Sequence, residues 1–145
     1  NPEYAQAYYS RGTVYSAQGN FDQAISDYSK AIDLNPEYAQ AYYSRATAYS
    51  KQGNLNRSIA DLSKVIEIDP GDIRAYNDRA AAYYLNNDYD KSWADVNQVT
   101  KFGGSINPKL LEDLRRNAAR EKKSRVQNVP LKREESGTPQ MYFPH

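Results

Sequence analysis

The sequence contains no cysteine, and its only histidine is His145, the last residue. Disulfide bonds, thiolate nucleophiles and cysteine-ligated zinc are therefore excluded. A single histidine at the end of the chain also leaves almost no residues for histidine-based catalysis or metal binding. No apolar run approaches the roughly 20 residues of a membrane span, and no basic-then-apolar signal segment opens the chain. The lack of cysteine does not distinguish a cytoplasmic from an exported protein, so the localisation stays open.

Net charge of either sign is also nearly absent, since 19 Lys and Arg oppose 18 Asp and Glu. No strong overall field attracts nucleic acid or anionic lipid. The charge is uneven, with a net −3 over residues 1–102 and a net +4 over residues 103–145. The excess lies at Arg115, Arg116, Arg120, Lys122, Lys123 and Arg125. A phosphate or RNA site is one interpretation, but without interleaved aromatic residues we favour a solvated helix end, so nucleic acid is not the expected partner.

An internal repeat with a period of 34 residues organises most of the chain. The segment NPEYAQAYYSR at residues 1–11 recurs unchanged at residues 35–45, and the first two periods are identical at 22 of 34 positions. A third period follows more loosely. The predicted units are residues 1–34, 35–68 and 69–102.

Each unit has room for two helices. In the first unit, residues 5–18 lack proline and favour one helix, and Gly19 and Asn20 interrupt it. Apolar residues from Phe21 to Ile32 then recur every three or four positions, which predicts a second helix with one buried stripe. The Asn35-Pro36 pair ends that helix, because proline cannot continue its hydrogen-bond ladder.

Aromatic, small and proline residues stand at the same offsets in successive units. In the first unit they are Tyr8, Gly12, Tyr15, Ala24, Tyr28 and Pro36, and in the second Tyr42, Ala46, Tyr49, Ser58, Leu62 and Pro70. This pattern resembles the tetratricopeptide repeat family, whose unit is a 34-residue helix-turn-helix. Pentatricopeptide repeats have a period of about 35 and lack this signature. The resemblance implies an all-α, right-handed α-solenoid of three repeats.

A capping helix and an extended tail are predicted after the third unit. Asn107 can cap a helix that starts at Pro108, so we expect a capping helix over residues 105–123 that covers the last repeat. The proline-rich and polar residues 124–145 predict an extended tail. We hypothesise that Met141, Tyr142 and Phe143 dock the tail in a groove of the same or a neighbouring molecule.

The periodic charges do not form a catalytic constellation. Arg11, Arg45 and Arg79 occupy one place in each unit, and Asp27, Asp61 and Asp95 occupy another. We interpret them as a structural ladder of ion pairs between helices, each contributing at most ~1 kcal/mol if exposed. No catalytic residue, cofactor or metal site is predicted.

The tyrosines divide into core and surface positions. The resemblance implies burial at the signature positions Tyr8, Tyr15, Tyr28, Tyr42, Tyr49, Tyr76 and Tyr83. The neighbouring concave surface is expected to carry Gln6, Tyr9, Ser10, Thr13, Gln40, Tyr43, Ser44, Thr47, Lys51, Arg74, Asn77 and Asp78. This composition is polar, nearly neutral and aromatic, and suits recognition of an extended peptide. A solvated face without a ligand is the alternative.

One subfamily of these repeats holds acidic chaperone tails with a clamp of Lys, Asn and Arg side chains. The resemblance places Tyr9, Thr13, Ser44, Arg74 and Asp78 at those positions. Only Arg74 keeps the charge, and Asp78 repels a carboxylate, so we expect no binding of such tails.

The sequence therefore predicts a non-enzymatic scaffold that binds a peptide or partner protein in its concave groove. Two alternatives stay open. The first is self-association through repeat stacking or tail exchange, since near-identical units with an uncapped first end can stack on another molecule. We also expect further repeats upstream of the first unit. The second is that the chain is a non-catalytic repeat part of a larger enzyme or assembly.

Overall fold

The computed structural model describes residues 1–128, and in this part of the chain it contains seven α-helices and no strand. The helices are α1 (Pro2–Ala17), α2 (Phe21–Leu34), α3 (Ala39–Lys51), α4 (Leu55–Ile68), α5 (Ile73–Leu85), α6 (Tyr89–Lys101) and α7 (Pro108–Gln127). The predicted all-α repeat array is confirmed. The docking residues proposed at positions 141–143 lie outside the described part.

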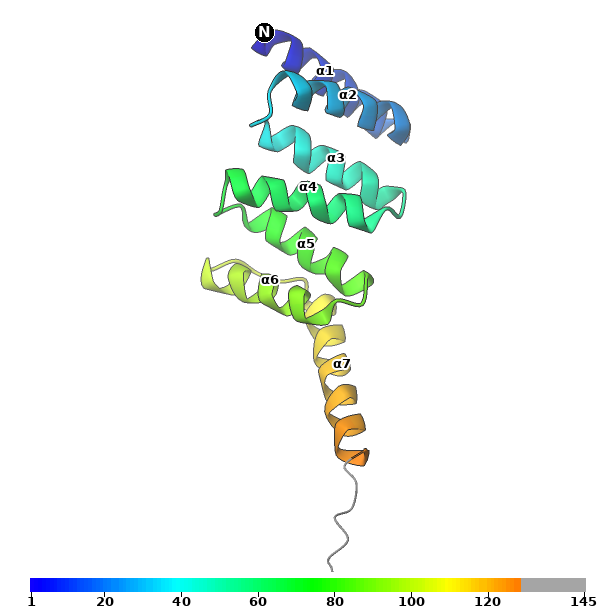
Figure 1. The fold of residues 1–145 in the computed structure, drawn as a ribbon, viewed down its shortest axis with the longest axis vertical. Helices are drawn as coiled ribbons and strands as arrows, with labels where there is room; N and C mark the ends of the chain where they lie inside the picture. Colours follow the sequence, from blue (N-terminus) through cyan, green and yellow to red (C-terminus); the bar gives the residue numbers. More distant parts are fainter. Residues whose placement is uncertain (129–145) are drawn as a thin grey trace, which may run out of the picture.

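The first six helices form three antiparallel pairs that stack along one axis, and α7 follows at the end of the stack (Figure 1). Tight turns join the two helices of each pair. Gly19 and Gly53 adopt φ values of 77° and 76° there, a left-handed conformation that glycine adopts without a Cβ clash. In the third pair Asn87 takes this conformation with a φ of 60°, as its short polar side chain allows.

Identical sequences differ in structure at the start of the first two units. The prediction placed the first helix at Ala5, but α1 begins at Pro2, where the Asn1 side chain accepts a hydrogen bond from the backbone N–H of Glu3. The same four residues at positions 35–38 form the turn after α2, in which the N–H of Tyr38 donates to the carbonyl of Asn35. In the second copy Asn35 is the C-cap of α2, and the next helix, α3, begins only at Ala39.

Helix α7 confirms the predicted start of the capping helix and corrects its end. The Asn107 side chain accepts from the N–H of Lys109, and Leu114 is fully buried against α5 and α6. The helix continues to Gln127, so the expectation of an extended chain from residue 124 is wrong for the first four residues. No glycine or proline interrupts residues 109–127, which explains the longer helix.

The predicted ladder of ion pairs is present, and its carboxylates are buried. Arg45 donates two hydrogen bonds to Asp61, of 2.8 and 2.7 Å, and a third, of 3.0 Å, to the Ser29 hydroxyl on α2 of the preceding pair. Arg79 repeats these bonds with Asp95 and with Ser63 on α4. Each of these arginines thus connects its own helix pair to the pair before it.

The ladder is less exposed than the sequence suggested. The side chains of Arg45 and Arg79 are only 19% and 18% exposed, and each guanidinium lies over two tyrosine rings of its own helix. Arg11 pairs with Asp27 in the same way, but its side chain is 56% exposed. The limit of ~1 kcal/mol applies to exposed pairs, so it does not hold for the two internal ones.

The expected burial of all signature tyrosines is wrong for four of them. Tyr28, Tyr42 and Tyr76 are buried. The others are only half-buried, and three of them occupy the same position in the three units, where a guanidinium lies over the ring in the second and third units. These four are Tyr8, Tyr15, Tyr49 and Tyr83.

Replacing Asp61 by Ala leaves the buried guanidinium of Arg45 without its carboxylate, and we expect a loss of about 3–5 kcal/mol in the free energy of unfolding. Urea denaturation followed by circular dichroism measures this loss. The matched variant Asp27→Ala costs less, because Arg11 is open to water. Equal losses in the two variants would contradict a role for burial in the ladder.

Asp27 also predicts a pH dependence of stability. The hydrogen bonds from Arg11 hold the pKa of Asp27 below its usual value of 3.8. The stabilisation is therefore complete above about pH 4 and declines as pH falls through the pKa of the folded protein. Urea denaturation of the unchanged protein and of Asp27→Asn, repeated at several pH values from 7 to 3, measures this effect. We expect the difference in their free energies of unfolding to be constant down to about pH 4 and smaller below. A difference that grows on acidification refutes this.

Candidate functional site

All twelve residues predicted for the concave surface lie on α1, α3 and α5, the first helices of the three pairs. We call the surface that they form the first-helix surface. Eight side chains there are exposed: Gln6, Ser10, Thr13, Gln40, Thr47, Lys51, Arg74 and Asp78. The other four, Tyr9, Tyr43, Ser44 and Asn77, are half-buried.

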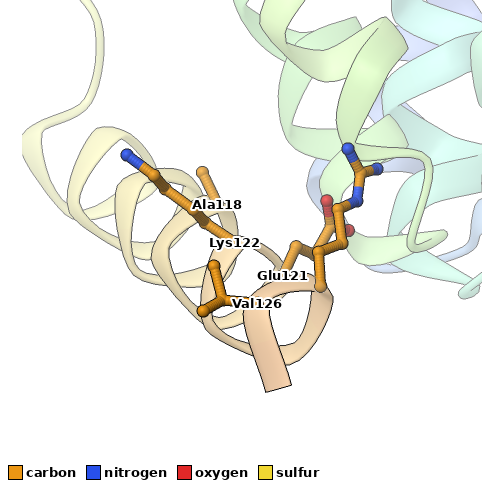
Figure 2. Close-up of a pocket in the computed structure, with 5 residues that line it drawn as sticks. Ala118, Glu121, Lys122 and Val126 are labelled. Carbon is orange, nitrogen blue, oxygen red and sulfur yellow. The ribbon is translucent and has the colours of Figure 1, made fainter. Parts of the chain in front are cut away.

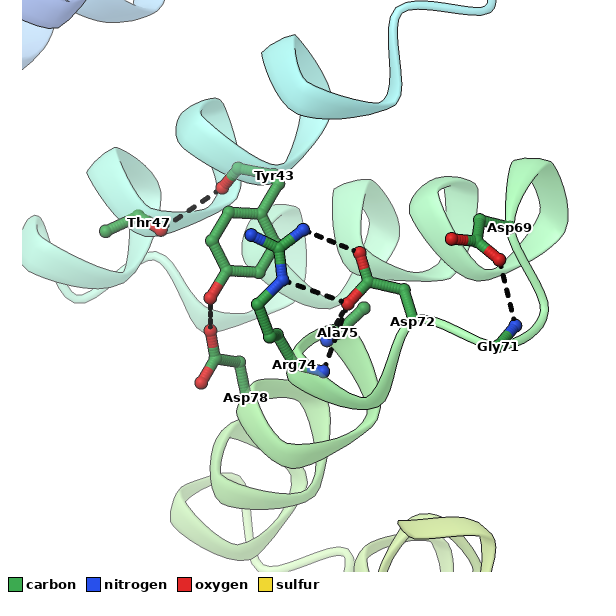
Figure 3. A network of polar contacts seen from close by, with 8 residues as sticks. All are labelled: Tyr43, Thr47, Asp69, Gly71, Asp72, Arg74, Ala75 and Asp78. Carbon is green, nitrogen blue, oxygen red and sulfur yellow. Dashed lines mark hydrogen bonds and ion pairs between the residues drawn. The ribbon is translucent and has the colours of Figure 1, made fainter. Parts of the chain in front are cut away.

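A polar network joins α3 to α5 across this surface (Figure 3). The Tyr43 hydroxyl donates a hydrogen bond of 2.5 Å to a carboxylate oxygen of Asp78. The guanidinium of Arg74 lies 4.8 Å from the centre of the Tyr43 ring and donates to Asp72 at 2.9 and 3.3 Å. Asp72 also caps α5 by accepting from the N–H groups of Arg74 and Ala75.

The ionisation of the network follows from these bonds. Burial, together with the hydrogen bond to Asp78, raises the pKa of Tyr43 above its ordinary value of 10, so its hydroxyl stays a donor at neutral pH. Burial alone raises the pKa of Asp72, but the hydrogen bonds from Arg74 and Ala75 outweigh it and hold that pKa below 3.8. Arg74 is therefore neutralised locally, whereas Asp78 receives only a neutral donor.

Tyr9 and Asn77 are held by neighbouring elements. The Tyr9 ring packs against the rings of Tyr28 and Tyr38, at centroid distances of 5.7 and 5.2 Å. The Asn77 amide donates to the carbonyl of Ser105 in the segment before α7. Both side chains thus present fixed rather than freely rotating groups to the first-helix surface.

A cavity of about 450 Å³ opens between α3 and α5, and we call it the trough. Four residues of α3 from Ala46 to Lys51 form one wall, and four residues of α5 from Asp78 to Leu85 form the other. Ser58 and Leu62 of α4 form the floor. The volume is within the range of about 300–1,000 Å³ that is usual for ligand sites.

A second hollow of about 320 Å³ lies beside the last turns of α7 (Figure 2). Its lining residues, among them Ala118, Lys122 and Val126, all belong to that one helix. It is the space between successive side chains of a helix, and no second element contributes a group. We therefore place the candidate site at the trough and not at α7.

Metal-binding groups are not assembled on the described residues. Within residues 1–128 no cluster of three or more His, Cys, Asp and Glu side chains is arranged to hold a metal ion. Over the same range no helix combines the length and the apolar character that a membrane crossing requires. The chemistry that the site offers is hydrogen bonding, charge pairing and apolar contact.

Sequence reasoning missed the hydrogen bond from Tyr43 to Asp78, for which the sequence carries no signal, and three further features, for which it carries one. The pairing of Arg74 with Asp72 had a signal, since an aspartate directly before a helical segment is a typical N-cap. The bonds from the ladder arginines to Ser29 and Ser63 also had a signal, because these serines are 34 residues apart. The sequence signal for the trough is weaker: Leu62 in the second unit stands where the first unit has Tyr28.

Comparison with family models identifies the class of protein. One model, TPR repeat, matches residues 12–53, and two models of the tetratricopeptide repeat match residues 39–72 and 62–94. Together the matches span residues 12–94, more than half of the chain. The chain belongs to the tetratricopeptide repeat family. No curated protein sequence matches it.

Solved structures share the fold. The first TPR of Spaghetti (RPAP3) bound to the HSP90 peptide SRMEEVD has a TM-score of 0.74 at 22% identity, over 84% of this chain and 96% of that one. The TPR2B domain of yeast Sti1, in a complex with pHsp70, has a TM-score of 0.70 at 26% identity, over 82% and 98%. MamA has a TM-score of 0.68 at 30% identity over 71% of this chain, which spans 60% of the MamA chain.

A double-mutant cycle tests the link between α3 and α5. Tyr43→Phe and Asp78→Asn each weaken the same hydrogen bond, so we expect a coupling of about 1 kcal/mol in the free energy of unfolding. Urea denaturation of the two single variants and the double variant gives this coupling. Tyr9→Phe combined with Asp78→Asn is the control, because the Tyr9 hydroxyl accepts from Ser44 instead. Additive effects of Tyr43→Phe and Asp78→Asn would contradict the network.

Proposed function

We propose that this chain is a non-enzymatic protein-interaction scaffold whose first-helix surface binds an extended segment of a partner protein. The observation that carries the proposal is the trough, to which α3, α4 and α5 all contribute. On the first-helix surface Tyr9 and Tyr43 supply rigid aromatic groups, and the amides and hydroxyls of this face supply hydrogen bonds to a peptide backbone. Membership of the tetratricopeptide repeat family supports the same function. We also propose that the scaffold consists of three repeat units, at residues 1–34, 35–68 and 69–102.

The charge of the site supports a ligand other than an acidic tail. The RPAP3 and Sti1 domains are described in complexes with a chaperone peptide and with pHsp70. In this chain, the one cation left at the clamp positions, Arg74, is already paired with Asp72. Asp78 places a second carboxylate beside it. We therefore infer that peptides ending in acidic residues bind weakly or not at all.

Self-association is the second candidate, favoured by the outer face of α1. Arg11 has the same pairing as the internal ladder arginines, but among residues 1–128 no serine accepts from it as Ser29 accepts from Arg45. Tyr4 on the same helix is 63% exposed. A helix pair from another molecule would supply the missing contacts. Tail docking through residues 141–143 and a place in a larger enzyme or assembly stay predictions.

Selection of a displayed library of random dodecapeptides on the full chain tests the scaffold. We expect enrichment of peptides that bind saturably in fluorescence anisotropy. Binding is lost in Thr13→Arg/Thr47→Arg, because both threonines are exposed on the first-helix surface and arginine side chains obstruct it.

The control Gln23→Arg/Ala60→Arg adds the same charge at exposed positions of α2 and α4 and leaves binding intact. Peptides that bind both variants equally would show that the first-helix surface is not the site. Sedimentation of the same samples at several concentrations measures self-association separately.

A further inference from the structure

The trough has the form of a channel parallel to α3 and α5. Tyr43 bonds to Asp78, 35 residues later, so residues about one period apart lie side by side. Helices α3 and α5 run in the same direction in the stack (Figure 1). The walls from Ala46 to Lys51 and from Asp78 to Leu85 extend over about two helical turns of each helix. An extended segment therefore fits along the helices.

The floor of the trough is open because of one exchange between units. In the first unit Tyr28 occupies the place of Leu62; its ring lies so close to Gly12 that a Cβ added there would be 2.9 Å away. Its hydroxyl donates to Thr13 on the first-helix surface, at 3.4 Å. In the second unit the smaller Leu62 lines the trough together with Ala46, and we attribute the open volume there to the missing ring. The floor that remains consists of the apolar side chain of Leu62 and the small side chain of Ser58.

The two ends of the trough carry opposite charges. Asp78 lies at the end of the trough where Tyr43 bonds to it. Lys51 lies at the other end, eight residues after Tyr43 on α3, which is about 12 Å at 1.5 Å per residue. Within residues 1–128 neither Asp78 nor Lys51 has an ion-pair partner. An extended peptide covers about 12 Å with three or four residues.

We propose that the trough recognises a peptide in which one large apolar side chain lies between a basic residue, placed at Asp78, and an acidic residue, placed at Lys51. The two charged residues are three or four positions apart, and the apolar side chain rests on Leu62. This inference rests on the proposed function and adds the ligand's charge order to it. The ligand is a segment of a partner protein with this pattern.

The internal repeat supplies a variant that closes the trough without new packing. Leu62→Tyr with Ala46→Gly gives the second unit the pair that Tyr28 and Gly12 form in the first. Circular dichroism and urea denaturation establish that this variant folds. Asp78→Asn is the companion variant, which removes the charge and leaves the trough open.

To test this inference, the dodecapeptides that bind the full chain are sequenced, and their affinities are measured by fluorescence anisotropy. We expect a basic, an apolar and an acidic position in the stated spacing. The affinity of such a peptide falls at least tenfold on Leu62→Tyr/Ala46→Gly. Asp78→Asn lowers the affinity of this peptide by about threefold to fivefold. It lowers the affinity of a peptide with Gln at the basic position much less.

Each outcome decides between the two proposals. Peptides that fail to bind Thr13→Arg/Thr47→Arg but bind Leu62→Tyr/Ala46→Gly at full strength overturn the trough inference and leave the scaffold intact. A consensus without an apolar position between opposite charges also overturns the inference. If no peptide depends on the first-helix surface, both proposals fail.

Discussion

The bidentate arginine–aspartate pair, with its third bond to a serine of the preceding helix pair, is the interaction on which the rest of the structure depends. Arg45 contacts Asp61 on α4 and Ser29 on α2, so one guanidinium fixes three helices relative to one another. Arg79 does the same one period later. Because the spacing between pairs is set by these bonds, α3 and α5 lie near enough for Tyr43 to reach Asp78 and far enough apart to leave the trough open.

Most of the fold follows from local sequence. The period of 34, the glycines of the turns and the proline-marked ends predict the helix pairs, because each signal acts through its own backbone conformation. The ends of helices depend on more than local sequence. The identical segments that begin with Asn1 and Asn35 differ in structure: Asn1 caps the start of α1, whereas Asn35 is the C-cap of α2. The burial of the tyrosines likewise depends on which neighbour lies beside each pair, and Tyr8 is half-buried where Tyr42 is buried.

The candidate site was predictable in position but not in its bonds. Helical spacing placed Tyr43, Arg74 and Asp78 on one surface, and the structure has them there. That Tyr43 donates to Asp78 while Arg74 turns to Asp72 depends on distances between helices, which the repeat pattern does not specify. We attribute the trough to the difference in side-chain volume between Tyr28 and Leu62, and the packing around these two residues is not specified by the repeat pattern.

The central claim is that the chain binds an extended peptide along α3 and α5, and methyl NMR of the full chain labelled at alanine tests it most directly. During titration with a selected dodecapeptide, we predict shifts at Ala46, Ala81 and Ala82, which line the trough, and none at Ala118 and Ala119 of α7. Shifts concentrated on α7 or on the outer face of α1, with the trough alanines unchanged, would contradict it.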